Sequence, residues 1–130
     1  MKKKILSLAA VPVLALFGTL AAMPVSADET ASADVTVTVA DTGTLKVVNE
    51  PLTVTDTDGD GALTVNDALY LIHEAKFEGG AAAGYATAET QWGLSIAKLW
   101  GNENGGSYGI TVNNVFSNGI ADEITEGNEI

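Results

Sequence analysis

Four aspartates fall at fixed spacing within the segment Asp56–Asp67. With Asp56 as position 1, their carboxylates occupy positions 1, 3, 5 and 12, where a twelve-residue calcium loop places side-chain oxygens. Gly61 stands at position 6, where the backbone must turn sharply through a conformation that side chains disfavour. This spacing predicts a Ca²⁺ site of the EF-hand type.

The other loop positions fit the same chemistry. Position 7 needs only a backbone carbonyl, position 8 is an apolar residue, Leu63, that would anchor the loop to the core, and position 9 can hold a bridging water. Mg²⁺ fits less well, because it prefers fewer protein ligands and stricter geometry. We therefore expect the ion to be held by Asp56, Asp58, Asp60, the carbonyl of Ala62, Thr64 through water, and Asp67.

The alternative is a solvated acidic turn with chance spacing, in which each close pair of carboxylates would cost about 1 kcal/mol in water. Asp67 departs from the common pattern, since glutamate usually stands at position 12. A loop ending in aspartate and followed at once by a helix resembles that of dockerin modules. Those modules carry two such loops, and Asn102–Gly106 does not supply a second one here.

Short β-type segments precede the loop. Val35–Val39 alternates valine with threonine, and Asp41–Gly43 carries a turn signal. Leu45–Val48 is expected to pair back as a second strand, and Leu52–Thr55 forms another short run that leads into the loop. The elements before the loop are therefore predicted to be strands.

One main helix is predicted directly after the loop. Apolar residues recur at helical spacing from Ala68 to Phe77. Asn66 or Asp67 would cap its start and Gly79-Gly80 would end it. Ala81–Gly84 is expected to extend this break as a loop.

The pattern then returns to strands. Leu94–Trp100 is expected to be a strand and Asn102–Gly106 a turn. Tyr108–Val112 alternates, and Asn113-Asn114 predicts a tight hairpin turn before Val115-Phe116. The order of strands, one helix and further strands predicts an α+β domain.

The N-terminal segment predicts export. Lys2–Lys4 form a positive start, Ile5–Ala22 is an apolar run, and Val25–Ala27 places small residues before polar ones. This is the layout of a signal peptide, residues 1–27, cut after its last alanine. An uncleaved membrane anchor is the alternative, but the proline and glycine inside the run weaken it as a spanning helix.

We expect residues 28–33 to be a linker and residues 34–130 one small domain. The chain has a net charge of −11, with 17 acids, six lysines, no arginine and no cysteine. Nucleic acid and anionic membranes are therefore excluded as partners, and cations are favoured. Without disulfides, a structural metal is one way to stabilise a small exported domain. This composition favours a secreted or cell-surface protein of a Gram-positive bacterium.

Other candidate sites have structural explanations. The single histidine, His73, is expected on the helix as a surface or packing residue rather than a ligand or base. Gly79–Gly84 could let the backbone approach a ligand, or could simply be a loop. Four aromatic residues could form a stacking platform for a sugar or could pack in the core: Tyr85, Trp92, Trp100 and Tyr108.

The order of short motifs resembles the transcobalamin-like C-terminal domain, over about residues 34–130. The motifs are Val35–Asp41, Thr64–Leu69, Leu94–Ile96 with Gly101, Tyr108–Asn114 and Glu126–Ile130. The resemblance implies a β-grasp-like, soluble-ligand-binding fold of exported bacterial proteins. Two positions depart from the family pattern. Asn114 stands where the family usually has the glycine of an Asn-Gly pair, and Asn128 stands where it usually has aspartate. Cobalamin binding does not carry over, because the carriers hold it mainly with a separate helical domain.

The resemblance also implies that a further strand follows Glu126–Ile130, so the chain is expected to stop before its fold is finished. The alternative is a variant whose sheet closes earlier. We expect a non-enzymatic calcium-binding module that binds a small ligand or an extracellular protein. A dockerin-like half-module, which would expose an apolar face of the helix Ala68–Phe77, and a small hydrolase with two convergent acids remain alternatives.

Overall fold

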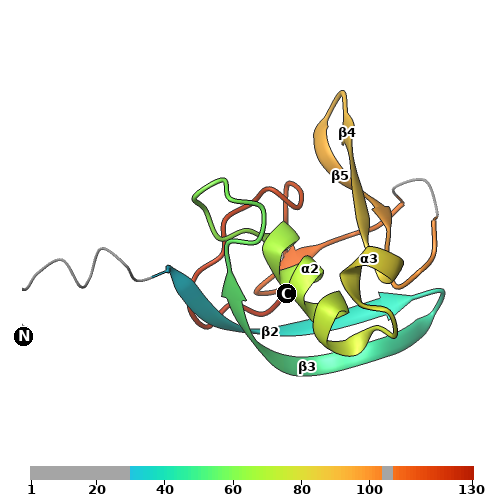
Figure 1. Cartoon of the computed structure of the whole chain (residues 1–130), viewed down its shortest axis with the longest axis horizontal. Helices are drawn as coiled ribbons and strands as arrows, with labels where there is room; N and C mark the ends of the chain where they lie inside the picture. The colour runs from blue at the N-terminus through green and yellow to red at the C-terminus, as the bar shows by residue number, and fades with distance from the viewer. Residues whose placement is uncertain (1–29, 104–106) are drawn as a thin grey trace, which may run out of the picture. The chain divides into compact units, whose positions relative to one another are not determined.

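A computed structural model describes residues 30–103 and 107–130 (Figure 1). The chain divides into Met1–Thr30 and Ala31–Ile130, and the second unit holds nearly all of the described residues. The predicted signal peptide, residues 1–27, lies outside the described residues. Among the described helices, none is long and apolar enough to cross a membrane.

A long antiparallel hairpin opens the domain. Strand β2 (Ser32–Asp41) pairs with strand β3 (Thr44–Thr55). Every second residue of β2 is buried, because successive side chains of a strand point to opposite faces of the sheet. The turn residues Thr42 and Gly43 both have positive φ, at 50° and 77°. Such a turn matches the twist of the strands it joins, and the predicted hairpin is confirmed.

Two boundaries in this hairpin differ from the prediction. β2 begins at Ser32, so the last two residues of the expected linker 28–33 belong to the strand, and Ala33 is buried. The two short runs expected after the turn form one continuous strand, β3, which includes Pro51. The pairing is irregular near Asn49, whose φ is 49°, and the register shifts between Val37 and Val39. Such a bulge accommodates the extra residue, so β3 continues through it as one strand.

The predicted main helix is present as α2 (Val65–Lys76), directly after the acidic loop. Its N-cap is Thr64 and not Asn66 or Asp67, which lie in its first turn. The reason is a capping box, in which Thr64 accepts a hydrogen bond from the backbone of Asp67 and the Asp67 carboxylate accepts one from the backbone of Thr64. Phe77 forms the C-cap.

A second helix occupies the segment that was predicted to be a loop. Helix α3 (Gly80–Gly84) is a single short turn that begins after Gly79, whose φ is 94°. The backbone N–H of Ala81 donates to the Glu74 carboxylate at 2.9 Å, which ties this turn to α2. Small residues therefore fold back against the main helix instead of forming an open loop.

The remaining strands form two short hairpins. β4 (Ala86–Thr90), which was not predicted, pairs with β5 (Gly93–Lys98), and β6 (Thr111–Val112) pairs with β7 (Val115–Phe116). The last pair is joined by Asn113-Asn114, with φ of 53° and 65°, as predicted. The named strands make three two-stranded sheets. The fold class is α+β, as predicted, and the β-grasp-like sheet stays a prediction.

The final residues lie alongside β2. Ile130 donates its N–H to the carbonyl of Thr36 at 2.9 Å, and its carbonyl accepts from the N–H of Thr38 at 2.8 Å. Glu129 forms a parallel bridge with Thr36, and its carbonyl accepts from the N–H of Asn113 at 2.8 Å. This segment therefore connects the β6–β7 turn to the opening hairpin.

One hydrophobic core joins the hairpin, the main helix and the C-terminal segment. Figure 1 shows α2 crossing the β2–β3 hairpin, and the two elements are in contact. Fully buried apolar side chains come from each part, and each stabilises the fold by about 1.5–3 kcal/mol: Val37, Val54, Val65, Ile72 and Ile120. The same helix buries two ionisable residues, Asp67 and His73.

Candidate metal centre

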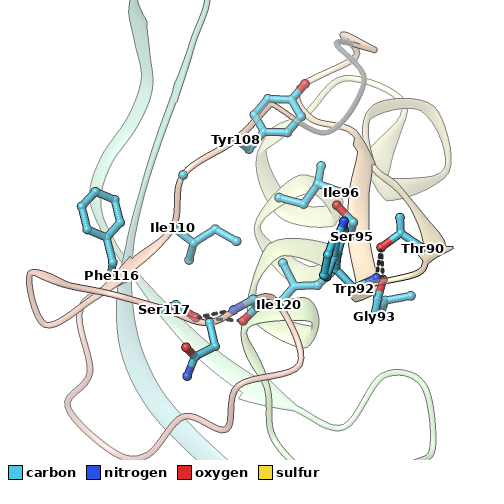
Figure 2. A pocket seen from close by; sticks show the side chains of 14 residues that line it. Thr90, Trp92, Gly93, Ser95, Ile96, Tyr108, Ile110, Phe116, Ser117 and Ile120 are labelled. Atoms are coloured by element: carbon cyan, nitrogen blue, oxygen red, sulfur yellow. Dashed lines mark hydrogen bonds between the residues drawn. The ribbon is translucent and has the colours of Figure 1, made fainter.

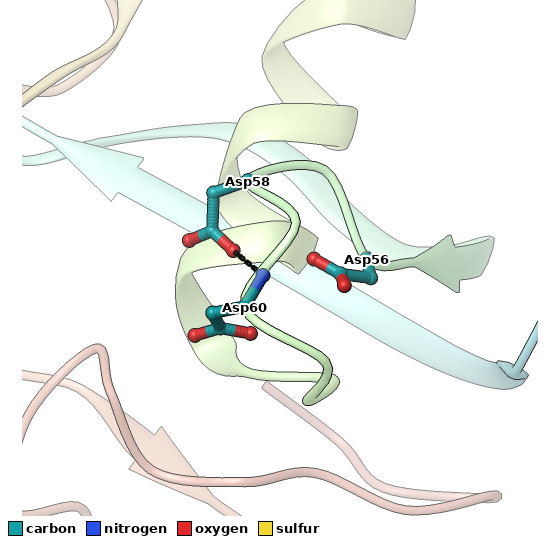
Figure 3. Close-up of side chains that lie close together, drawn as sticks. All are labelled: Asp56, Asp58 and Asp60. Carbon is teal, nitrogen blue, oxygen red and sulfur yellow. Dashed lines mark hydrogen bonds between the residues drawn. The ribbon is translucent and has the colours of Figure 1, made fainter.

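Three of the predicted ligands come together in the loop between β3 and α2. Carboxylate oxygens of Asp56, Asp58 and Asp60 lie within 4.8 Å of one another (Figure 3). Gly59 and Gly61 have φ of 78° and 88°, values that glycine adopts at no steric cost. The sharp turn predicted at Gly61 is therefore present, and this turn brings the three carboxylates to one side of the loop. The group could hold a metal ion.

Asp56 organises the loop through both of its oxygens. Oδ1 accepts a hydrogen bond from the backbone N–H of Gly59 at 2.7 Å, and Oδ2 accepts one from that of Gly61 at 2.8 Å. These bonds, with the one from Gly61 first, lower the pKa of Asp56. These bonds favour the ionised form of the first ligand residue and fix its carboxylate against the loop backbone.

Asp58 and Asp60 continue the same pattern of short-range bonds. The N–H of Asp60 donates to Asp58 Oδ1 at 3.3 Å, and the N–H of Ala62 donates to Asp60 Oδ1 at 2.9 Å. Desolvation raises the pKa of Asp58, and the negative charges of Asp67 and Asp60 raise it further. A cation in the loop would remove the unfavourable part of this charge arrangement.

Asp67, the expected ligand at position 12, does not join the three-carboxylate group. Its buried carboxylate accepts four hydrogen bonds instead. Oδ1 accepts from the N–H and hydroxyl of Thr57, both at 2.7 Å, and Oδ2 accepts from the N–H and hydroxyl of Thr64, at 2.9 and 3.0 Å. Asp67 therefore closes the loop on itself and starts the helix. Asp67 has both roles because it is residue 12 of the loop and also residue N3 of the helix.

Thr64, the expected holder of a bridging water, is buried, and its hydroxyl takes part in the capping box. Leu63 packs against the core as predicted, and its carbonyl accepts from the N–H of Ile124 at 2.9 Å. The first N–H groups of α2 find partners in the same distant segment: Val65 donates to Asp122 and Asn66 donates to Ile120. The loop is thus held from the C-terminal side of the chain.

Asn66 links the loop to the core, a role that sequence reasoning missed. Its Nδ2 donates to Asp58 Oδ2 at 3.1 Å, and its Oδ1 accepts from the Tyr85 hydroxyl at 2.8 Å. Burial raises the pKa of Tyr85 well above its ordinary value, so the phenol remains a hydrogen-bond donor at neutral pH. No local spacing relates Asn66 to Tyr85, so only the fold could reveal this contact.

His73 is a packing residue, one of the two roles predicted for it. It is fully buried, with Nδ1 at 2.7 Å from the carbonyl of Leu69, while Nε2 accepts from the N–H of Trp100 at 2.9 Å. These two bonds together select the neutral tautomer with the proton on Nδ1. Burial lowers the pKa of His73, which keeps it uncharged at neutral pH.

The four aromatic residues do not form one platform. Tyr85 stacks on His73 with ring centroids 5.0 Å apart, and Trp100 lies 4.9 Å from the same ring. Trp92 is 87% exposed at the tip of the β4–β5 hairpin, and Tyr108 is half-buried, with its hydroxyl bonded to the carbonyl of Asn102. Core packing therefore accounts for Tyr85 and Trp100 and in part for Tyr108, but not for Trp92.

No protein-family model matches the chain, and neither the curated proteins nor the solved structures contain a match to it. The resemblance to the transcobalamin-like domain and to dockerin loops therefore stays a prediction. The geometry of Asp56, Asp58 and Asp60, three carboxylates arranged so that they could hold a cation, stands independently of it.

Proposed function

We propose that this chain is an exported calcium-binding module that binds a ligand or protein partner outside the cell, and that it is not an enzyme. One observation carries the proposal: the loop backbone draws three carboxylates within 4.8 Å of one another. Like charges at this separation repel, and a hard divalent cation offsets the repulsion. Oxygen-only donors at this spacing favour Ca²⁺ over softer metals.

In the proposed site, Asp56, Asp58 and Asp60 provide side-chain oxygens and Ala62 provides its carbonyl. Asp67 joins them by giving up its bonds to Thr57, while its other oxygen keeps the helix cap. Thr64 contributes through water. Because Asp67 must exchange existing hydrogen bonds for the ion, the affinity is expected to be weak, on the order of 10⁻⁴ to 10⁻³ M, as in other extracellular modules.

The ion stabilises the domain by closing the connection between β3 and α2. A ligand that binds only the folded state adds RT ln(1 + [L]/Kd) to the free energy of unfolding. For a site of about 1 mM affinity, 10 mM calcium would add about 1.4 kcal/mol. In a chain without cysteine, this replaces part of what disulfides supply in other exported domains.

Thermal unfolding of the full chain with CaCl₂, with MgCl₂ and with chelator tests the proposal. Calcium is expected to raise the midpoint, magnesium to raise it less, and Asp56→Ala to abolish the calcium effect. Glu89→Gln is the matched control, because it removes one negative charge from an exposed strand outside the loop. Equal midpoints with calcium and with chelator, together with no heat in calorimetry at millimolar calcium, would exclude the site.

No specific observation favours either alternative function. The dockerin-like alternative requires an exposed apolar helix face, whereas α2 buries Ala68, Leu69 and Ile72 in the core. The hydrolase alternative requires two convergent acids in a cleft. Among the described residues, the group of three acids that converges is that of the loop, where their oxygens accept hydrogen bonds from the loop's own backbone.

A further inference from the structure

A groove of about 450 Å³ lies between the β4–β5 hairpin and the segment 108–120. Figure 2 shows Ile110 and Ile120 between the two walls, with Phe116 on one side and Trp92 and Ser95 on the other. It belongs neither to the calcium loop nor to the cluster around His73. A volume of this size accommodates a small ligand or a few units of a polymer.

Two large aromatic side chains on the rim are exposed. Trp92 is 87% exposed and Phe116 is 80% exposed. Trp92 lies in the two-residue turn between β4 and β5, where its N–H donates to Thr90 Oγ1 at 3.1 Å and Thr90 Oγ1 donates to the carbonyl of Gly93 at 2.7 Å. The turn that presents the indole is thus held by its own hydrogen bonds, while the ring remains open to a ligand. An exposed indole beside a groove marks an interaction site.

The groove carries no ionisable charge, although the chain has a net charge of −11. Among the residues that the structure describes, its lining contains no aspartate, glutamate, lysine or histidine. A cationic ligand would find no carboxylate in it, and an anionic ligand would find no amine. The one ionisable group in the described part of the lining is the phenol of Tyr108, whose pKa is raised by desolvation, so it stays neutral. The charge pattern therefore fits an uncharged ligand.

Polar groups accompany the apolar floor. The Ser95 hydroxyl and the Asn118 carboxamide form no hydrogen bond within the described part of the chain, so both can bond a ligand. The Ser117 hydroxyl, in contrast, already has partners: the Gly119 carbonyl and the Asp122 carboxylate both lie within reach of its one proton, and its oxygen accepts from the N–H of Gly119. An aromatic face, an apolar floor and a few free hydrogen-bonding groups match a ligand that has both C–H faces and hydroxyl groups.

We propose that this groove binds a neutral oligosaccharide or polysaccharide, with a sugar ring stacked on Trp92. Phe116, on the opposite wall, contacts the saccharide as well, and Ser95 and Asn118 bond its hydroxyls. An apolar peptide or a second copy of the chain would use the rings as well, but neither needs the free hydroxyl and carboxamide in an uncharged setting. The proposal does not depend on calcium binding.

Native gel electrophoresis through soluble polysaccharides tests the proposal with the full chain. The neutral probes are arabinoxylan, galactomannan, mixed-linkage β-glucan and glycogen, and polygalacturonate is the charged probe. At least one neutral probe is expected to retard the protein, and polygalacturonate is not. Trp92→Ala is expected to weaken the retardation at least about tenfold, Phe116→Ala to weaken it less, and Trp92→Phe to retain part of it.

Tyr70→Ala is the matched control, because Tyr70 is a 41% exposed aromatic residue on α2 outside the groove. It is expected to leave binding unchanged. Thermal midpoints of all variants show whether a loss of binding reflects unfolding, and exposed Trp92 predicts little change. Three outcomes overturn the proposal: no retardation by any neutral probe, equal retardation of Trp92→Ala, or sedimentation showing that Trp92 serves only to join two copies of the chain.

Discussion

The two ends of helix α2 are built on different principles. At its N-terminal end, charged and polar groups bond over short sequence distances, as between Thr57 and Asp67, ten residues apart. At its C-terminal end, His73 bonds the N–H of Trp100 from 27 residues away, and aromatic rings pack around it. The acidic loop at the first end is a local motif that spacing can reveal, although Val65 and Asn66 also donate to the distant carbonyls of Asp122 and Ile120. The second exists only after distant segments have met.

The two ends also differ in how they tolerate change. The loop residues Asp58 and Asp60 are exposed, so a changed side chain meets solvent. The Phe77 ring, in contrast, packs closely against the backbone at Gly84 and at Gly101. A Cβ added at Gly84 would lie 2.5 Å from the ring, and one added at Gly101 would lie 2.9 Å from it. Hydrogen bonds therefore hold one end, and close packing holds the other.

Asp67→Ala should produce the largest effect at the polar end, even without calcium. It removes the acceptor of four hydrogen bonds and leaves the N–H of buried Thr64 without its partner. The expected loss is about 3 kcal/mol in the free energy of unfolding, measured by urea denaturation in chelator. Asp60→Ala is the control and should cost well under 1 kcal/mol there. Equal losses in the two variants would mean that the buried carboxylate has no special role.

Gly84→Ala tests the packed end and should cost about 2 kcal/mol, because its Cβ would overlap the Phe77 ring. Alanine otherwise favours a helix over glycine, so a loss of stability isolates the overlap. In a Phe77→Leu background the same change should cost clearly less, since the ring is gone. An additive double mutant would contradict the packing argument.

The pH dependence of the free energy of unfolding tests the packed end through His73, with a smaller expected effect than the two substitutions above. Burial lowers the pKa of His73 in the folded state below its ordinary value of 6.5, so the unfolded chain binds its proton first. The contribution of His73 to the free energy of unfolding is therefore greatest above about pH 6.5, and it falls as the pH drops from there toward the folded-state pKa. In chelator, His73→Gln should remove this slope.

His73 is the single histidine, so its NMR signals report the same pKa directly in the unmodified protein. A midpoint at or above 6.5 would contradict the assignment. This measurement remains informative if His73→Gln does not fold.

Tyr85→Phe gives the smallest effect and tests how far the two ends are coupled. It deletes the hydroxyl that bonds Asn66, which in turn bonds Asp58 of the loop. The expected cost is about 1 kcal/mol of stability, with calcium affinity changed by no more than a few-fold in calorimetry, because Asn66 keeps its bond to the loop. Complete loss of calcium binding would show that the loop depends on the core and is not a local motif.

Local physical chemistry was sufficient where partners lie near in sequence. The hairpin turn at Asn113-Asn114, the sharp turn at Gly61 and the helix after the loop follow from backbone preferences and periodicity. The N-cap was misplaced because Asp67 satisfies two patterns at once, as loop position 12 and as the N3 residue of a capping box. Spacing alone could not show which of these its oxygens would serve.

The sequence by itself determined the α+β class, the main helix and the acidic loop, since each depends on interactions within a few residues. Only the tertiary structure decided that Asp67 would be buried, that His73 would accept a bond from Trp100, and that Trp92 would stand exposed beside a groove free of ionisable charge. The physical reason is that burial and pairing depend on which distant segments meet. Short-range preference determines the elements, whereas packing between them decides which polar and aromatic groups remain available to bind.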